Sequence, residues 1–136
     1  LVVLDDLEFK GMDKTQKRNL DRLFGYCSTH KNISVILCSQ DAFNVPPIVR
    51  RCSNLWVLWK MLDLDSLATC ARKTGMKAGN FNSIFNQLML APKDSLWLDH
   101  TDSTPYPLRK NGYKIINKQT KGQETKTELN ADNFSV

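Results

Sequence analysis

Two pairs of polar residues follow apolar runs, and they are the residues best suited to chemistry. Asp5 and Asp6 end the aliphatic run at the start of the chain, and Ser39 and Gln40 follow the run at 33–38. An acidic pair at a strand end, as in a Walker B strand, can hold Mg²⁺ through water (Asp5) and position or activate an attacking water (Asp6). A glutamine amide both donates and accepts hydrogen bonds, which suits Gln40 to sensing a terminal phosphate. We therefore expect Asp6 and Gln40 to be catalytic and Asp5 and Ser39 to contact an ATP–Mg²⁺ ligand.

Each pair also has a simpler explanation. Asp5 and Asp6 could cap backbone amides in a turn, and Ser39 and Gln40 could form an ordinary polar turn after a strand. The two pairs together are more specific than either one, because neighbouring parallel strands end at one edge of a sheet. That edge is where open α/β sheets bind ligands.

Three arginines are candidates for an arginine finger, the charge that oligomeric nucleotide hydrolases often supply from a neighbouring subunit. Arg18 and Arg22 lie in the first expected helix, and Arg50 follows the second expected strand. A solvated basic face is the alternative explanation for each. The net charge of +5 and the pI of about 9.1 are, by themselves, only a weak indication of a polyanionic partner.

Strand and helix patterns alternate along the chain. Strands are expected at 1–5, 33–38, 55–59, 95–98 and near 107–110, and helices at 14–28, from Asp63 or Asp65 to Gly75, and from Asn80 to before Pro92. Asp13 and Gln16 form a capping-box pattern, and Pro46 and Pro47 can open a short helical turn. The pattern predicts an α/β fold with a mostly parallel sheet flanked by helices. The short connection before the third strand is its weakest part.

The composition indicates a globular domain at 1–112 and a flexible polar tail at 113–136. The chain has 136 residues, 41% of them apolar, and no run near the ~20 apolar residues that span a bilayer. The four cysteines are widely spaced, and the two histidines have no partner at metal-ligand spacing. We interpret the cysteines as reduced thiols of an intracellular protein that is neither secreted nor membrane-bound.

One expected motif is absent. The sequence contains no Gly-x-x-x-x-Gly-Lys-Ser/Thr loop, the Walker A motif that cradles phosphates. The first residue is Leu, directly inside an apolar run, so we interpret the sequence as part of a longer protein whose preceding part supplies that loop. By itself the chain is expected to bind nucleotide poorly and to be inactive.

The order of these features is similar to that of a known family. The segments that carry the similarity are LVVLDDL, HKNISVILCSQDAFNVPPIVRRCSN, DLDSLATCARKTGM and SLWLDHTDSTPYPLRKNGY, within residues 1–110. The chain resembles the genome-packaging ATPases of large double-stranded DNA viruses and virus-like transposons, the poxvirus type within the FtsK–HerA class of P-loop NTPases. The phrase that begins at His30 and leads to Ser39 and Gln40 is the closest match.

The resemblance implies a partial P-loop NTPase core of the ASCE type that lacks its Walker A half. It implies Asp5 as the Mg²⁺-associated acid, Asp6 as the catalytic carboxylate and Gln40 as a sensor, with ATP and Mg²⁺ as cofactors. The implied protein is a ring-shaped homo-oligomer that moves double-stranded DNA into a capsid, with capsid or portal-vertex proteins as partners, in the host cytoplasm or nucleus or on the virion. Relatives often carry an arginine at the position where this chain has Thr29. The candidates for the arginine finger are therefore Arg18, Arg22 and Arg50.

Two other hypotheses remain open at this stage. The chain could be an inactive virus- or transposon-derived remnant, or a basic nucleic-acid-binding adaptor with an α/β core. It could also be another Mg²⁺-dependent α/β domain such as a phosphoacceptor receiver. A receiver fold requires a further Asp at the end of a later strand. Asp41 lies one residue too far into the loop after its strand to fill that position.

Overall fold

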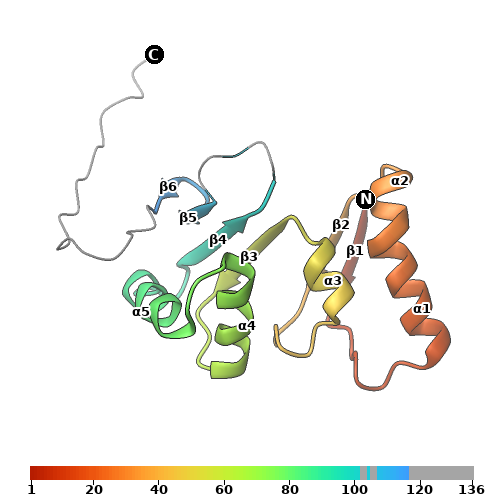
Figure 1. Cartoon of the computed structure of the whole chain (residues 1–136), viewed down its shortest axis with the longest axis horizontal. Coiled ribbons are helices and arrows are strands. Elements are labelled where there is room, and N and C mark those ends of the chain that lie inside the picture. The colour runs from red at the N-terminus through yellow and green to blue at the C-terminus, as the bar shows by residue number, and fades with distance from the viewer. Residues whose placement is uncertain (102–103, 105–106, 117–136) are drawn as a thin grey trace, which may run out of the picture.

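The computed structural model describes residues 1–101, 104 and 107–116, and it has an α/β fold with two separate sheets (Figure 1). The strands are β1 (Val2–Asp5), β2 (Val35–Cys38), β3 (Leu55–Trp59), β4 (Ser95–Asp99), β5 (Leu108–Lys110) and β6 (Lys114–Ile115). The helices are α1 (Lys14–Arg22), α2 (Ser28–His30), α3 (Pro47–Cys52), α4 (Leu64–Thr74) and α5 (Ala78–Leu88), and the π-helical turn η1 (Leu23–Cys27) joins α1 to α2.

The first sheet consists of β1 and β2, which pair in parallel as expected. The register runs from Val2 opposite Val35 to Asp5 opposite Cys38. After a loop at residues 6–13, the crossover between them is helical from Lys14 to His30, because α1, η1 and α2 follow one another without a break. Asp13 caps α1 in a complete capping box, accepting a bond from the Gln16 amide at 2.8 Å while the Gln16 side chain accepts one from the Asp13 amide at 2.9 Å.

The second sheet is antiparallel, so the prediction of a mostly parallel sheet holds only for β1 and β2. Its strand order is β3-β4-β5-β6, and every neighbouring pair is antiparallel. The reason lies in the connection between β3 and β4. Two packed helices, α4 and α5, occupy it, so the chain travels out along one helix and back along the other. It therefore returns to the end of β3 where it left and runs back alongside that strand.

The tail assignment at 113–136 is only partly within the described residues. Lys114 and Ile115 form β6 on the edge of β5, and the Ile116 amide donates a 2.9 Å hydrogen bond to the Leu108 carbonyl. The turn before β6 uses positive φ angles at Asn111 and Gly112, which these two residue types tolerate. Residues 117–136 lie outside the described part of the chain.

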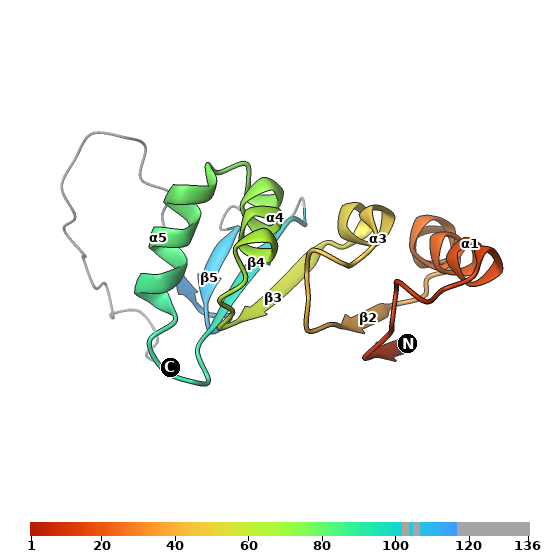
Figure 2. The ribbon, with the colours of Figure 1, turned by 90° about the horizontal axis from the view of Figure 1, so that it is seen from below.

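The four longer helices lie along one side of the strands (Figure 2). Under them are two hydrophobic cores, one for each sheet. The core of the antiparallel sheet includes the fully buried Phe81, Phe85 and Leu96, and the core of the parallel pair includes Leu20, Phe24 and Val49. Within the described residues, no helix is both long enough and apolar enough to span a membrane.

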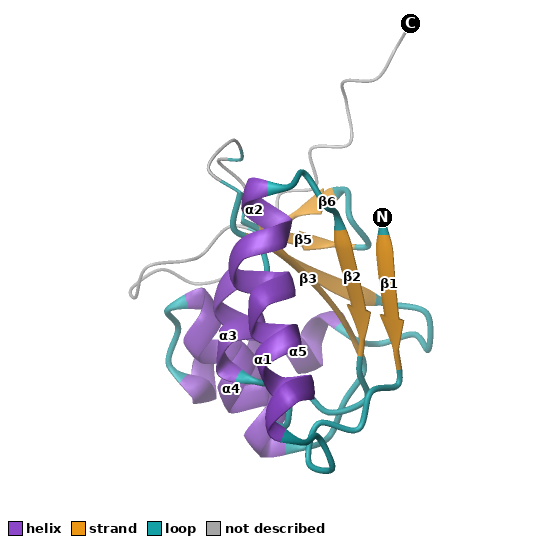
Figure 3. Cartoon of the chain, turned by 90° about the vertical axis from the view of Figure 1, so that its right-hand side faces the viewer, coloured by secondary structure: helices purple, strands orange, loops and turns teal. Residues whose placement is uncertain are grey.

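The side of the parallel pair opposite α1 is exposed. Val2 and Leu4 of β1 are half-buried toward α1, whereas Val3 is 56% exposed and its paired neighbour Ile36 on β2 is 50% exposed. We call the outward-facing residues Val3, Asp5, Ile36 and Cys38 the exposed β1–β2 face. Within the described residues, each sheet also has two unpaired edges, on β1 and β2 of the parallel pair and on β3 and β6 of the antiparallel sheet. In Figures 1 and 3, β2 and β3 are the neighbouring edge strands of the two sheets.

Candidate functional site

The ends of β1 and β2 lie side by side, and they bring together two of the residues that the sequence singled out. Asp5 is paired with Cys38 at the last position of the ladder, so Asp6 and Ser39 leave the sheet at the same edge. The Gln40 amide nitrogen Nε2 then donates a hydrogen bond to Asp6 Oδ1 at 3.4 Å. Both side chains are exposed, so the pair is accessible to a ligand.

Asp6 has a left-handed backbone conformation. Its φ angle is +49°, in a region that most L-residues avoid and that aspartate enters more readily than bulky side chains. Such conformations are enriched at ligand and active sites, where the surrounding structure holds them. Because the chain turns at Asp6, the carboxylates of Asp5 and Asp6 lie in different surroundings. Asp5 still belongs to β1 and lies on the exposed β1–β2 face.

The loop after β2 is organised by a residue that the sequence analysis did not place in the site. Asp41 Oδ1 accepts hydrogen bonds from the backbone amides of Phe43 at 2.8 Å and Asn44 at 3.2 Å. The Asn44 side-chain amide donates to the other carboxylate oxygen. These bonds form an Asx-type turn, and an Asp followed by Asn and two prolines was its signal in the sequence.

Asp41 also connects this loop to α4. The Ser66 hydroxyl donates to Asp41 Oδ1 at 3.0 Å and accepts from the Phe43 amide at 3.2 Å. Ser66 is only 2% exposed, and it lies in the first turn of α4, which Asp63 caps. The loop that carries Gln40 is therefore held from both its own turn and a neighbouring helix. No local pattern in the sequence could have revealed the contact with Ser66.

Ser39 is engaged within the same turn. Its hydroxyl donates to the Asp41 carbonyl at 3.2 Å and accepts from the Asp41 amide at 3.3 Å. This hydroxyl therefore has a local structural partner, and a contact with a nucleotide would require it to exchange that partner.

The acidic residues can be compared with what Mg²⁺ and ATP require. In the described residues, no three His, Cys, Asp or Glu side chains gather into a metal site. Mg²⁺ is commonly held by one or two carboxylates while substrate phosphates and water complete its shell, so Asp5 and Asp6 have suitable chemistry. The phosphates themselves need a cradle of backbone amides, and the sequence has no Walker A loop to provide one.

The three candidate finger arginines lie elsewhere. Arg18 and Arg22 are exposed on α1, whereas Arg50 is half-buried in α3 and lines a pocket against β3 and α4. Among the described residues, no hydrogen bond or ion pair joins any of the three to Asp6 or Gln40. An arginine finger acts on a neighbouring subunit, so these positions leave that role open to all three.

Comparisons of the chain with models of protein families, with curated proteins and with solved structures found no match. Any functional assignment therefore depends on the geometry of the strand ends and on the sequence similarity described above.

Proposed function

We propose that this chain is the part of a P-loop ATPase that begins at its acidic strand, in a motor that hydrolyses ATP to move double-stranded DNA into a capsid. One observation carries the proposal. The Gln40 amide contacts the Asp6 carboxylate at the ends of two paired parallel strands, at the sheet edge where α/β folds bind ligands. The resemblance to packaging ATPases assigns the same two residues to catalysis.

In this function, each side chain has a separate task. The Asp6 carboxylate orients the attacking water and accepts its proton, while Gln40 holds that carboxylate and donates to the terminal phosphate. Asp5 would hold Mg²⁺, through water. When it is bound, the ion neutralises part of the negative charge of the phosphates.

The unpaired strand edges support the idea that a further segment completes the core. Both β2 and β3 have an unpaired edge in the described structure, and such edges expose hydrogen-bonding groups that proteins usually cover. Val3 and Ile36 also leave an apolar surface on the exposed β1–β2 face. A strand between β2 and β3, followed by a helix on that face, would cover both, and the strand would carry the Walker A loop.

The proposed motor works as a homo-oligomeric ring inside the host cell or with the virion. Arg18, Arg22 or Arg50 then reaches the nucleotide of the adjacent subunit, and capsid or portal-vertex proteins anchor the ring.

The test uses the longer protein that contains this chain. A Gly-rich loop ending in Lys-Ser/Thr is expected within about a hundred residues upstream, from the usual size of P-loop domains. Asp6→Asn is expected to lower the ATP hydrolysis rate about 100-fold or more while fluorescent-nucleotide binding persists. Gln40→Ala is expected to slow hydrolysis without unfolding the protein.

The matched control is Glu8→Gln, which removes a carboxylate from an exposed loop residue near Asp6. Its hydrolysis rate is expected to equal that of the wild type. Near-normal turnover by Asp6→Asn, or an upstream sequence without the loop, would contradict the proposed function.

A second candidate function is nucleic-acid binding without catalysis, either by an adaptor or by an inactive remnant. The observation that favours it is the exposed face of α1, which carries Lys14, Lys17, Arg18 and Arg22 against the single acid Asp21. DNA binding that weakens steeply with salt and is indifferent to ATP and Mg²⁺ would identify this function. DNA binding that depends on nucleotide would identify the motor.

A further inference from the structure

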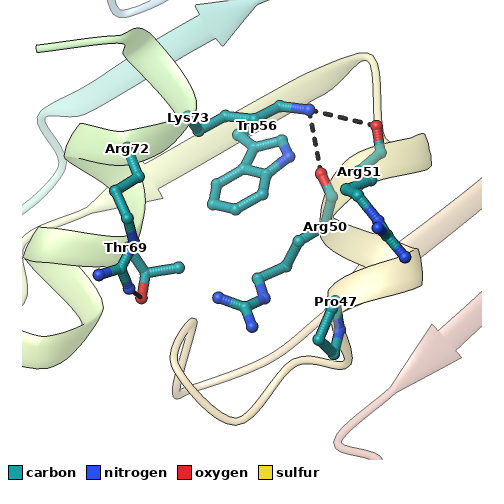
Figure 4. A pocket seen from close by; sticks show the side chains of 7 residues that line it. All are labelled: Pro47, Arg50, Arg51, Trp56, Thr69, Arg72 and Lys73. Atoms are coloured by element: carbon teal, nitrogen blue, oxygen red, sulfur yellow. Dashed lines mark hydrogen bonds between the residues drawn. The ribbon is translucent and has the colours of Figure 1, made fainter.

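A pocket of about 340 Å³ lies between α3, β3 and α4, and its lining is strongly basic. Arg50 and Arg51 come from α3, Trp56 from β3, and Thr69, Arg72 and Lys73 from α4 (Figure 4). Of the residues that the structure describes, no carboxylate lines the pocket. Its volume falls within the range of small-molecule sites, about 300–1,000 Å³.

The arginines of this pocket carry uncompensated charge. In the described part of the chain, the two ion pairs are Arg109 with Asp99 and Lys110 with Asp94, and neither involves α3 or α4. Guanidinium groups stay charged at any ordinary pH. In Figure 4, the Arg50 side chain extends from α3 toward the side of the pocket that α4 forms, and the Arg72 side chain runs along α4 to Thr69. Like charges that line one pocket repel each other, and a bound anion relieves that repulsion.

Lys73 differs from the arginines because it already has partners. Its ammonium donates to the carbonyls of Arg50 and Ser53, both at 3.0 Å, at the C-terminal end of α3. It also lies 5.6 Å from the centre of the Trp56 ring, a cation–π distance. Burial lowers the pKa of Lys73. Lys73 thus connects α3, β3 and α4 and lines the pocket between them.

Two donors at the pocket have no acceptor among the described residues. Arg50 Nε and Trp56 Nε1 are both buried, and neither has a hydrogen-bond partner in the part of the chain that the structure describes. Such groups are normally paired, so each one calls for an explanation. Arg72 is exposed, and its Nη2 donates to Thr69 Oγ1 at 2.9 Å. The pocket therefore combines fixed positive charge with hydrogen-bond donors that have no acceptor. A matching ligand is an anion that accepts hydrogen bonds and donates none.

We propose that this pocket binds a phosphate group. A phosphate is negatively charged, presents acceptor oxygens in several directions, and pairs with guanidinium forks. Its several oxygens can accept hydrogen bonds from donors on different elements of the pocket, including Arg50 on α3 and Arg72 on α4. The phosphate can belong to a free polyphosphate or to a DNA backbone. The site is separate from the pair Asp6 and Gln40, so the proposal does not depend on ATP hydrolysis.

The test is direct binding to the full 136-residue chain at low salt. Inorganic pyrophosphate is titrated by calorimetry and by tryptophan fluorescence, and a labelled DNA duplex is titrated separately by anisotropy. Arg72→Gln is the main variant, since Arg72 is exposed and its loss removes no buried group. Lys60→Gln is the control, because it removes one positive charge from an exposed residue outside the pocket.

The proposal expects binding that Arg72→Gln weakens about tenfold and Arg50→Gln at least as much, while Lys60→Gln leaves it within about twofold. Circular dichroism of each variant checks the fold. An effect on pyrophosphate alone identifies a free phosphate as the ligand, and an effect on DNA alone identifies the backbone. If neither probe binds, or if Arg72→Gln and Lys60→Gln behave alike, the pocket is not a phosphate site.

Discussion

The Ser66 hydroxyl at the start of α4 donates a 3.0 Å hydrogen bond to the Asp41 carboxylate in the loop after β2. This bond joins the helical layer of the antiparallel sheet to a loop of the parallel pair. Gln40 directly precedes Asp41, and its amide contacts Asp6. The position of the candidate catalytic pair therefore depends on a contact between two parts of the chain that have separate hydrophobic cores.

Replacement of Asp41 by Ala is expected to destabilise the fold. The substitution removes the acceptor for two backbone amides and for the buried Ser66 hydroxyl, so we expect a loss of about 1–3 kcal/mol in the free energy of unfolding. Ser66→Ala removes one partner and should cost about 1 kcal/mol. Urea unfolding followed by circular dichroism measures both, with Glu8→Ala as an exposed control. An Asp41→Ala variant as stable as the control would show that the network does not hold the loop.

Replacement of Asp6 by Gly removes the candidate catalytic carboxylate but is expected to leave the fold as stable as before. Because φ at Asp6 is +49°, Gly adopts the conformation without a steric penalty, whereas Ala does not. Asp6→Gly should keep or raise the free energy of unfolding by up to about 1 kcal/mol, and Asp6→Ala should lower it by about 1 kcal/mol. Thermal and urea unfolding measure the order of the two variants. Equal stability of the Gly and Ala variants would mean that the left-handed turn carries no strain.

Local features of the fold were predictable from the sequence. The capping box of Asp13 and Gln16, the cap at Asp63 and the left-handed Gly75 at the end of α4 all occur as their residue types predict. The strand β3 has the expected bounds. The parallel pairing of β1 and β2 followed from the long helical connection between them. Each of these features depends on a few neighbouring residues or on one connection.

Features that depend on tertiary contacts were not predictable. The direction of β4 depends on how α4 and α5 pack against each other, and alternation of strands and helices cannot show that. The contact between Asp41 and Ser66 likewise joins two segments that share no local pattern. The basic pocket was missed for the same reason, because Arg50 and Arg72 belong to different helices that only the fold brings together.

The cysteines provide a chemical test of burial. Cys38 is exposed on the exposed β1–β2 face, whereas Cys70 is fully buried and burial raises the pKa of its thiol to about 12. Because the thiolate is the reactive form, Cys70 should resist alkylation near neutral pH until the protein unfolds. Iodoacetamide labelling followed by peptide mass spectrometry should therefore modify Cys38 first. Rapid labelling of Cys70 in the native protein would contradict the packing of α4 against the sheet.

Asp94 gives the fold a specific acid sensitivity. Its carboxylate accepts a 2.8 Å bond from the Ala91 amide and a 2.9 Å bond from the Lys110 ammonium. The Ala91 amide first, and then Lys110 and Asn111, lower the pKa of Asp94 from 3.8 to about 2. Since the folded protein holds this proton less tightly than the unfolded chain, protonation favours unfolding. The stabilisation is complete above about pH 4 and is lost as the pH falls toward 2.

Comparison of Asp94→Asn with the wild type across this pH range tests the linkage. At pH 6 the variant should be less stable, because Asn cannot carry the charge that the Lys110 ammonium contacts. The difference should shrink below about pH 4 and nearly vanish at about pH 2, where the wild-type carboxyl is itself becoming neutral. Urea midpoints at several pH values measure the difference, with Glu8→Gln as the exposed control. A difference between Asp94→Asn and the wild type that stays constant from pH 6 to about pH 2 would mean that the lost stability comes from packing and not from the charge.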